Sequence, residues 1–237
     1  MCAPLVLSLF PGIGLLDLAF ELEGFHVVRG PDVIWGGDVR RFHVPPGKFD
    51  GIIGGPPCQA FSQTNNLHAA AHEDLIPEFL RVVREAAPSF VVMENVRQTL
   101  GHAAIPPDWH AAILRDWDCG GETSRTRAFW TWPMMLMEPG GRAPGDPSHS
   151  VLASALKRGK SGSGYVTTKK FLPGDLTVKE YARLQGACHI ASQLHAHKAG
   201  KAFIVHGLGN GVPVAMGRYV ARAVRIALSA SSLTPSN

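Results

Sequence analysis

The sequence has few cysteines and no long apolar run, and both shortages exclude classes of protein. Its four cysteines, Cys2, Cys58, Cys119 and Cys188, lie far apart and form no Cys-x-x-Cys pair, which argues against a zinc site and a disulfide framework. No apolar run approaches the roughly 18 residues that a membrane-spanning helix needs, and the N-terminus lacks the layout of a signal peptide. We therefore expect a soluble, cytoplasmic protein without a metal site or a membrane partner.

Charge is also scarce, and it is unevenly distributed. Charged residues make up 18% of the 237 residues and hydrophobic residues 45%, so the chain can bury a sizeable core as one domain with at most a small appendage. Residues 1–100 carry 7 Lys/Arg and 11 Asp/Glu, whereas residues 101–237 carry 16 and 8. A basic second half fits a surface that faces a polyanion, although an ordinary solvated surface has the same pattern.

The first hundred residues predict an α/β unit. An apolar strand over 5–10 stops at Pro11-Gly-Ile-Gly14, a helix over 15–23 follows, and a second strand covers 25–28. This order is typical of nucleotide-binding folds. We expect further strands over 50–53 and 89–93 and a helix over 75–87. Each chemically suggestive cluster then follows a strand end, which is where open α/β sheets bind ligands.

Other segments have a distinct composition. Repeated glycines and prolines between residues 28 and 50 leave little room for a helix, so we expect a crossover of turns and a short extended piece. Residues 133–174 are rich in Gly, Pro and Ser, which by itself slightly favours a linker. Thr177 and Glu180 form a capping signature for a helix ending near Gln185. Pro213 is expected to be the first residue of the last helix, which ends near Ala230.

Two clusters carry most of the chemistry. The Gly12-x-Gly14 turn followed by Asp32 suggests a cofactor that contains adenosine, since a carboxylate about 20 residues after such a turn accepts ribose hydroxyls. The turn alone is equally consistent with a plain tight turn, and Asp17 in place of a third glycine argues against a dinucleotide. Cys58 follows a Pro-Pro turn at a strand end, which favours an exposed, rigid nucleophile, with Glu94 as a candidate proton donor.

Six elements, in this order, resemble those of the cytosine-C5 DNA methyltransferases. They cover nearly the whole chain except residues 133–175, and they are Phe10-Pro-Gly-Ile-Gly14, Gly54-Gly-Pro-Pro-Cys-Gln-Ala-Phe-Ser62, Glu94-Asn-Val96, Arg125-Thr-Arg127, Arg183-Leu-Gln-Gly186 and Gly209-Asn-Gly-Val-Pro213. The resemblance implies a Rossmann-like methyltransferase fold of the α/β class, with a mixed, mostly parallel sheet and a small target-recognition region. It also implies that the last helix packs beside the first.

The resemblance assigns roles to individual residues. Cys58 is implied to add to carbon 6 of cytosine, Glu94 to contact ring nitrogen 3 and the exocyclic amine, and Arg125 and Arg127 to hold the base. The implied cofactor is S-adenosylmethionine, contacted by Phe10, Gly12, Ile13, Gly14, Asp32, Asp38, Val39, Pro57, Asn210 and Val212. Asp32 is implied to take the ribose hydroxyls, and Asp38 the adenine amine.

The implied substrate is double-stranded DNA with a flipped cytosine. Residues 133–175 are expected to read the target sequence, and residues 1–132 and 176–237 to form a discontinuous catalytic domain. Candidate DNA contacts are Gln59, Ser62, Lys157, Arg158, Lys160, Lys169, Lys170 and Arg183. We expect a monomer from a bacterial cell or a phage. Methylation of tRNA cytosine and an inactive DNA-binding module are the alternatives.

Four departures from the family pattern stand out. Ser8 replaces the acidic residue that usually opens the first element, and Thr123 stands where a glutamine usually precedes the two arginines. The segment over 63–72 lacks the usual arginines, and the crossover helix before Asp38 is missing. None of these departures removes a reacting group, so activity is expected.

Overall fold

A mixed β-sheet forms the centre of the molecule. The computed structural model describes residues 3–57, 73–139, 146–148, 150 and 177–231. Within these ranges one sheet has the order β2-β1-β3-β4-β6-β5. Strands β1 to β4 run parallel, and β6 is antiparallel to both of its neighbours. The strands are β1 (Leu5–Leu9), β2 (His26–Arg29), β3 (Gly51–Gly54), β4 (Phe90–Asn95), β5 (His110–Arg115) and β6 (Thr126–Trp132). The predicted α/β class and mostly parallel sheet are confirmed.

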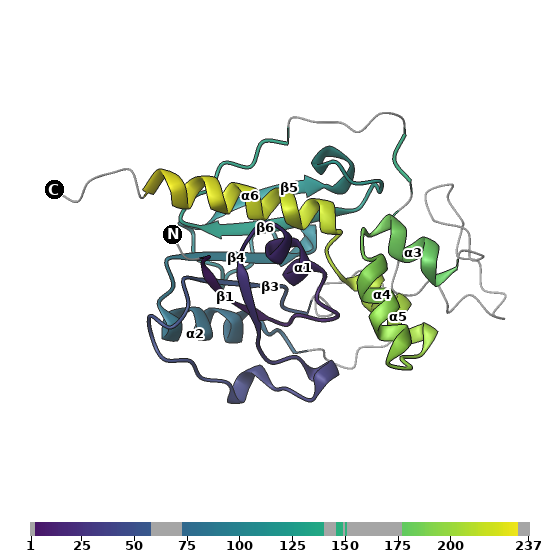
Figure 1. Ribbon diagram of the computed structural model, residues 1–237. Helices are drawn as coiled ribbons and strands as arrows, with labels where there is room; N and C mark the ends of the chain where they lie inside the picture. The colour runs from purple at the N-terminus through teal and green to yellow at the C-terminus, as the bar shows by residue number, and fades with distance from the viewer. Residues whose placement is uncertain (1–2, 58–72, 140–145, 149, 151–176, 232–237) are drawn as a thin grey trace.

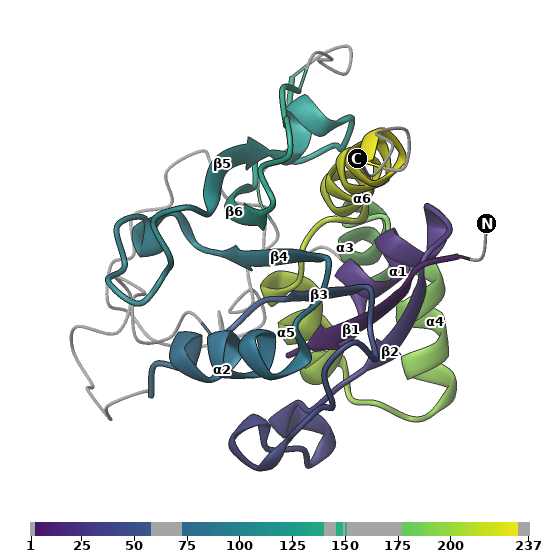
Figure 2. The same cartoon turned by 90° about the vertical axis from the view of Figure 1, so that its left-hand side faces the viewer.

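Helices cover both faces of the sheet (Figures 1 and 2). Because side chains alternate along a strand, Val6 and Ile53 face α1 (Leu15–Leu22) and α6 (Val214–Ser231), whereas Leu7 and Ile52 face α2 (Ile76–Ala86). The last helix thus packs beside the first, as the resemblance implies. None of the helices in the described ranges is long and apolar enough to span a membrane.

Three short helices gather beside the start of α1. They are α3 (Val178–Leu184), α4 (Cys188–Ala196) and α5 (Lys201–Asn210), and their apolar side chains pack on Ile13 and Leu15. The predicted capping box of Thr177 and Glu180 opens α3. The expected start of the last helix was one residue early, because α6 begins at Val214 and Pro213 precedes it. These helices place the segment after α5 against the carboxyl end of the sheet.

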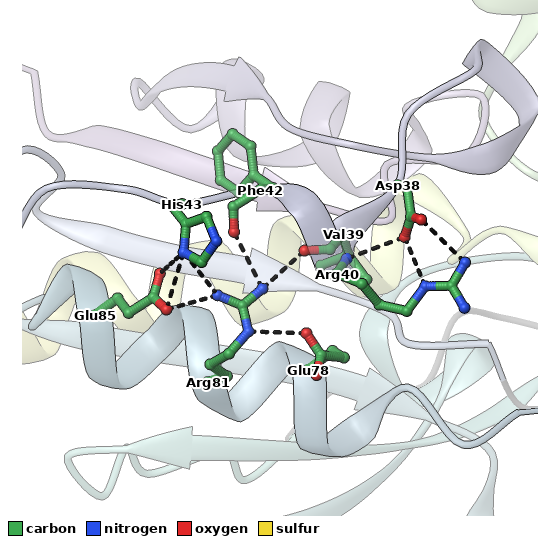
Figure 3. Close-up of polar contacts among 8 residues, drawn as sticks. All are labelled: Asp38, Val39, Arg40, Phe42, His43, Glu78, Arg81 and Glu85. Atoms are coloured by element: carbon green, nitrogen blue, oxygen red, sulfur yellow. Dashed lines mark hydrogen bonds and ion pairs between the residues drawn. The ribbon is translucent and has the colours of Figure 1, made fainter.

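The crossover between β2 and β3 contains no α-helix, as expected from its composition. Two single turns of 3-10 helix, η1 (Val33–Trp35) and η2 (Val39–Arg41), carry the chain instead. Arg81 on α2 holds this segment, since its Nη2 donates to the carbonyls of Val39 (2.8 Å) and Phe42 (3.1 Å). Two carboxylates hold the same guanidinium: Glu78 Oε2 lies 2.8 Å from Arg81 Nε, and Glu85 Oε1 lies 2.6 Å from Arg81 Nη1 (Figure 3). Arg81 therefore ties the shortened crossover to α2, the helix that packs on one face of the sheet.

Replacing Arg81 with methionine is expected to lower the free energy of unfolding by about 2–3 kcal/mol, because two carbonyls lose charged donors and two carboxylates lose their partner. The matched control is Arg84→Met, which removes an exposed arginine of the same helix. Urea unfolding followed by circular dichroism measures both variants. Equal midpoints for the two variants would show that Arg81 does not hold the crossover.

Candidate functional site

A cavity of about 360 Å³ lies at the carboxyl ends of β1, β3 and β4. Its volume is within the roughly 300–1,000 Å³ of small-molecule and cofactor sites. Three chain turns follow those strand ends and line it, namely Phe10–Ile13, Gly54–Pro57 and Glu94–Val96. The crossover contributes Asp32, Asp38 and Val39 to the wall, and the end of α5 and the segment after it contribute Asn210 and Val212. Parallel strands explain this convergence, because their carboxyl ends share one edge of the sheet.

The glycine-rich turn is held through both backbone polar groups of Gly12. The N–H of Gly12 donates to Asp32 Oδ2 (2.8 Å), and the Gly12 carbonyl accepts from Trp35 Nε1 (2.7 Å). Asp32 Oδ1 also accepts from the N–H of Ile34 at 3.0 Å. Phe10 adopts a positive φ of 55° at the start of this turn, a strained conformation that clusters at binding sites. Asp32 thus shapes the turn and lines the cavity together with it.

Asp38 is paired within the crossover. Its carboxylate accepts from Arg40 Nε (2.9 Å) and Nη2 (3.0 Å), and these hydrogen bonds hold the pKa of Asp38 below its ordinary value. Arg40 Nη1 also lies 3.0 Å from Glu73, which lines the cavity at the far side of the undescribed segment 58–72. Val39 is buried beneath this pair.

A carboxylate and a guanidinium meet at the β4 side of the cavity. Because β6 is antiparallel to β4, the start of β6 comes to the end of β4, with Asn95 opposite Ala128. Arg127 Nε thereby lies 2.8 Å from Glu94 Oε1. Burial raises the pKa of Glu94, and the charges of Arg127 and Arg125 offset only part of that effect. Arg125 is 3% exposed and Glu94 8%.

The turn that leads to Cys58 is anchored on the same strand. A side chain at Gly55 would place its Cβ 2.7 Å from Glu94 Oε2, so a larger residue there would displace the Glu94 carboxylate. Asn95 Nδ2 donates to the carbonyl of Pro56 at 3.1 Å. Pro57 lines the cavity, while Cys58, Gln59 and Ser62 lie outside the described residues.

The remaining cavity residues come from the far end of the chain. Val212 is buried in the wall, and Asn210 Nδ2 lies 2.9 Å from His206 Nε2. Gln185, in the Arg-Leu-Gln-Gly element, donates to the carbonyl of Leu208 at 2.6 Å and accepts from the N–H of Val214 at 3.0 Å through its own carbonyl. That buried glutamine joins α3 to α5 and α6, and so holds the Asn210–Val212 wall in place.

A buried pair, Thr123 and Asp116, lies next to Arg125. Thr123 is one of the positions at which the sequence departs from the family pattern. The hydroxyl of Thr123 donates to Asp116 Oδ2 (2.7 Å), and so does its backbone N–H (2.9 Å). Both residues are 0% exposed. Burial raises the pKa of Asp116, while the Thr123 hydrogen bonds and the charge of Arg125 oppose the rise. Thr123 therefore fixes the loop that carries Arg125.

We expect Thr123→Val to lower the free energy of unfolding by about 1–3 kcal/mol, because the isosteric side chain leaves a buried carboxylate without its hydroxyl donor. Thr123→Ser retains the hydroxyl and serves as the control, with a loss below about 1 kcal/mol from one methyl group. Guanidinium unfolding measures the difference. A valine variant as stable as the serine variant would contradict this account.

The predicted DNA contacts are divided between described and undescribed parts. Arg183 is described, and its Nη1 lies 2.5 Å from Glu122 Oε2. The basic residues Lys157, Arg158, Lys160, Lys169 and Lys170 lie outside the described residues. Ser148, from the expected recognition region, exchanges backbone hydrogen bonds with Glu122 (2.7 Å) and Ser124 (2.8 Å). That region therefore touches the loop before Arg125.

The two cysteines in the described residues, Cys119 and Cys188, do not line the cavity. Burial, together with the charges of Asp116 and Asp118, raises the pKa of Cys119 to about 12, which keeps the thiol protonated at neutral pH. Cys188 is exposed on α4. In the part of the chain that the structure describes, no group of three or more His, Cys, Asp or Glu side chains is arranged to hold a metal ion.

Sequence patterns did not reveal several residues that shape the site. Asn95 belongs to a recognised element, but its bond to Pro56 depends on two strands lying side by side. Trp35, Arg81 and Asp116 act on segments up to 42 positions away.

Comparison with known proteins gives one consistent answer. The family model for the C-5 cytosine-specific DNA methylases matches residues 36–105. The Type II methyltransferase M.HindV of Haemophilus influenzae is 32% identical over 208 residues, which is 74% of this chain and 64% of that enzyme. M.NgoPII of Neisseria gonorrhoeae is 33% identical over 117 residues, 41% of this chain and 34% of the enzyme. The chain thus spans about a third of the length of the first curated relatives that it matches.

Solved structures share the fold at low sequence identity. A methyltransferase of Schizosaccharomyces pombe, Dnmt2, superposes with a TM-score of 0.59 at 13% identity, covering 97% of this chain and 100% of its own. The Entamoeba histolytica methyltransferase EhMeth gives a TM-score of 0.62 at 14% identity, covering 96% of this chain and 99% of its own. The matched family model, the relatives and the order of the six elements agree that the chain is similar to the C-5 cytosine-specific DNA methylases.

Proposed function

We propose that the chain transfers a methyl group from S-adenosylmethionine to carbon 5 of cytosine in double-stranded DNA, through a covalent adduct with Cys58. The observation that carries the proposal is the ion pair of buried Glu94 with half-buried Arg127 in the wall of a cofactor-sized cavity, at the turn that leads to Cys58. The M.HindV and M.NgoPII relatives, both Type II methyltransferases, support the same reaction.

The residues of this chain have complementary roles in that reaction. The Cys58 thiolate adds to carbon 6 of the ring, which makes carbon 5 electron-rich. Glu94 donates a proton or a hydrogen bond to ring nitrogen 3, and burial favours the protonated, donating form because it raises the pKa of Glu94. Arg127 and Arg125 orient Glu94 and the base. Carbon 5 then takes the methyl group, with S-adenosylhomocysteine as the leaving group. Loss of the carbon-5 proton to water breaks the bond to the Cys58 sulfur and restores the ring, and the proton on nitrogen 3 returns to Glu94.

The cavity residues suit S-adenosylmethionine, which supplies the methyl group. Each Asp32 oxygen accepts one backbone N–H and has a second lone pair for a ribose hydroxyl. Gly12 lines the wall, and a Cβ there would meet no protein atom within 4 Å, so the backbone is open to a ligand. Asp38 can accept the adenine amine at the crossover, and Phe10, Ile13, Gly14, Val39, Pro57, Asn210 and Val212 form the rest of the pocket.

DNA is the proposed substrate, with residues 133–175 as the region that reads it. The backbone hydrogen bonds of Ser148 to the loop before Arg125 support this assignment, because they tie the region to the catalytic side of the cavity. The target cytosine must leave the base stack to reach Glu94. Arg183 and the lysines of the undescribed segment are proposed to contact phosphates.

The test is transfer from tritiated S-adenosylmethionine to duplex DNA and, in parallel, to tRNA, followed by digestion and chromatography of the nucleosides. Label in 5-methyldeoxycytidine is the expected result. A duplex that contains 5-fluorocytosine should also trap a covalent protein–DNA adduct, because fluorine blocks the final elimination. Label only in 5-methylcytidine from tRNA would favour the RNA alternative, and no transfer to either acceptor would favour an inactive binding module.

A further inference from the structure

The described wall of the cavity is rich in carboxylates, and its arginines are already paired with them. The acidic residues that line it are Asp17, Asp32, Asp38, Glu73 and Glu94. Arg40 donates to Asp38 and Glu73, and Arg127 lies 2.8 Å from Glu94. Such a wall repels an anionic group, because like charges at short distance are unfavourable. The carboxylate of the methionyl end, which is the one anionic group of S-adenosylmethionine, therefore needs a part of the wall with donors to spare.

Neutral hydrogen-bond donors lie together at the carboxyl end of α5. His206 and Asn210 are one helical turn apart there, and both are exposed and line the cavity. Asn210 Nδ2 lies 2.9 Å from His206 Nε2. Because an amide nitrogen has hydrogens but no free lone pair, the imidazole Nε2 accepts this hydrogen bond. The proton of the neutral ring is therefore on Nδ1, which is available as a donor beside the second hydrogen of the amide.

The other neutral polar side chains in the described part of the wall are buried and bonded within the protein. Ser8 is 1% exposed and donates to Asp17, and Asn95 is 2% exposed and donates to the carbonyl of Pro56. A ligand carboxylate can reach neither of them. By its chemistry and its exposure, the pair at the end of α5 is the part of this wall that fits a carboxylate.

The fold brings His206 close to the start of α1. Its neighbour Gly207 packs on Ile13 so closely that an added Cβ would lie 2.5 Å from Ile13 Cγ2, and α1 begins two residues after Ile13. A helix N-terminus stabilises an anion through its free N–H groups and its dipole. The buried acid in the first turn of α1, Asp17, is balanced by Arg29 at 2.9 Å. The surroundings of His206 are therefore compatible with a bound carboxylate.

We propose that His206 binds the carboxylate of the methionyl end of the cofactor through its Nδ1–H, while Asn210 holds the imidazole ring from the other nitrogen. This inference rests on the proposed cofactor. His206 lies outside the six elements that carry the resemblance, so the resemblance assigns it no role. The contact orients the ligand, because it keeps the anionic group at the α5 edge and away from the acidic side of the wall.

The experiment is a thermodynamic cycle between protein and ligand, measured by calorimetry. S-adenosylhomocysteine and an analogue in which hydrogen replaces its carboxylate are titrated into the full chain and into His206→Phe. Removal of the carboxylate should weaken binding to the original chain at least about tenfold, since hydrogen bonds to charged groups are strong. In His206→Phe the same removal should cost less than about threefold, because the donor is already absent. His195→Phe, which replaces an exposed histidine of α4 outside the cavity wall, should retain the full dependence on the carboxylate.

A purely structural role for His206 would give a different result. His206→Phe would then weaken both ligands by the same factor, and this equal dependence on the carboxylate overturns the inference. An original chain that binds both ligands equally overturns it as well, as does a reduced dependence in His195→Phe. Failure of the original chain to bind S-adenosylhomocysteine overturns the proposed cofactor itself. If His206→Phe does not fold, His206→Ser takes its place with the same expected values.

Discussion

Replacing Cys58 with serine is expected to reduce methyl transfer by on the order of 10⁴-fold or more, the scale on which loss of a covalent nucleophile acts. A hydroxyl is far less ionised than a thiol at neutral pH, so the addition to carbon 6 does not start. The turn before Cys58 is held by the bond from Asn95 to Pro56 and by the close approach of Gly55 to Glu94. Because this turn is held in place, the loss of methyl transfer should come from the missing sulfur and not from a displaced side chain.

Cys188→Ser is the matched control, because Cys188 is exposed on α4 and lines no part of the cavity. It should transfer methyl groups at the original rate. Affinity for S-adenosylhomocysteine should be unchanged in both variants, and trapping by 5-fluorocytosine DNA should vanish only in Cys58→Ser. Substantial transfer by Cys58→Ser would mean that the reaction proceeds without this nucleophile.

The second large effect is expected from Glu94→Gln, which should lower the transfer rate by about 10²- to 10⁴-fold, the usual contribution of a positioned proton donor. Glutamine has nearly the same shape and can still accept from Arg127, so the structure and cofactor affinity should be retained. The variant therefore separates proton donation from packing. Glu21→Gln is the control for loss of an acid that lies outside the cavity.

Proton donation by Glu94 should also be visible in the pH dependence of the transfer rate. Burial raises the pKa of Glu94, so the protonated donor is present below that raised pKa and is lost as pH rises through it. The original enzyme should therefore lose activity on the alkaline side as Glu94 ionises. Glutamine does not titrate, so this decline should disappear in Glu94→Gln while the plateau is lower. An unchanged alkaline decline in the variant would assign the decline to a different group.

Local patterns predicted the early part of the fold well. The glycines and prolines between β2 and β3 exclude a helix because they disrupt helical hydrogen bonding and φ angles, and two single 3-10 turns are found there. The capping pair Thr177 and Glu180 fixes the start of α3 through its own side chains. Strands β1, β3 and β4 were predictable because buried parallel strands are continuous apolar runs.

Patterns failed where strands and helices were short or partly exposed. The antiparallel pair β5 and β6 was not anticipated, and β5 alternates between exposed and half-buried residues over most of its length. Helices α4 and α5 were not anticipated either, because their apolar residues form no strong stripe. In α5 the buried residues include Gly209. The exposed residues include Lys201 and Asn210, the first and last residues of the helix. A weak local signal of this kind is resolved only by packing against neighbouring elements.

The six elements and their order were sufficient to predict the candidate reacting residues Cys58 and Glu94, because each of these follows or ends a strand with a readable pattern. Which side chains meet was decided by the tertiary structure. Arg127 reaches Glu94 because β6 runs antiparallel beside β4, and the Ser8 hydroxyl reaches Asp17 because α1 packs over the end of β1. Strand direction and helix placement come from the burial of the whole core, and no local stretch of sequence contains that information.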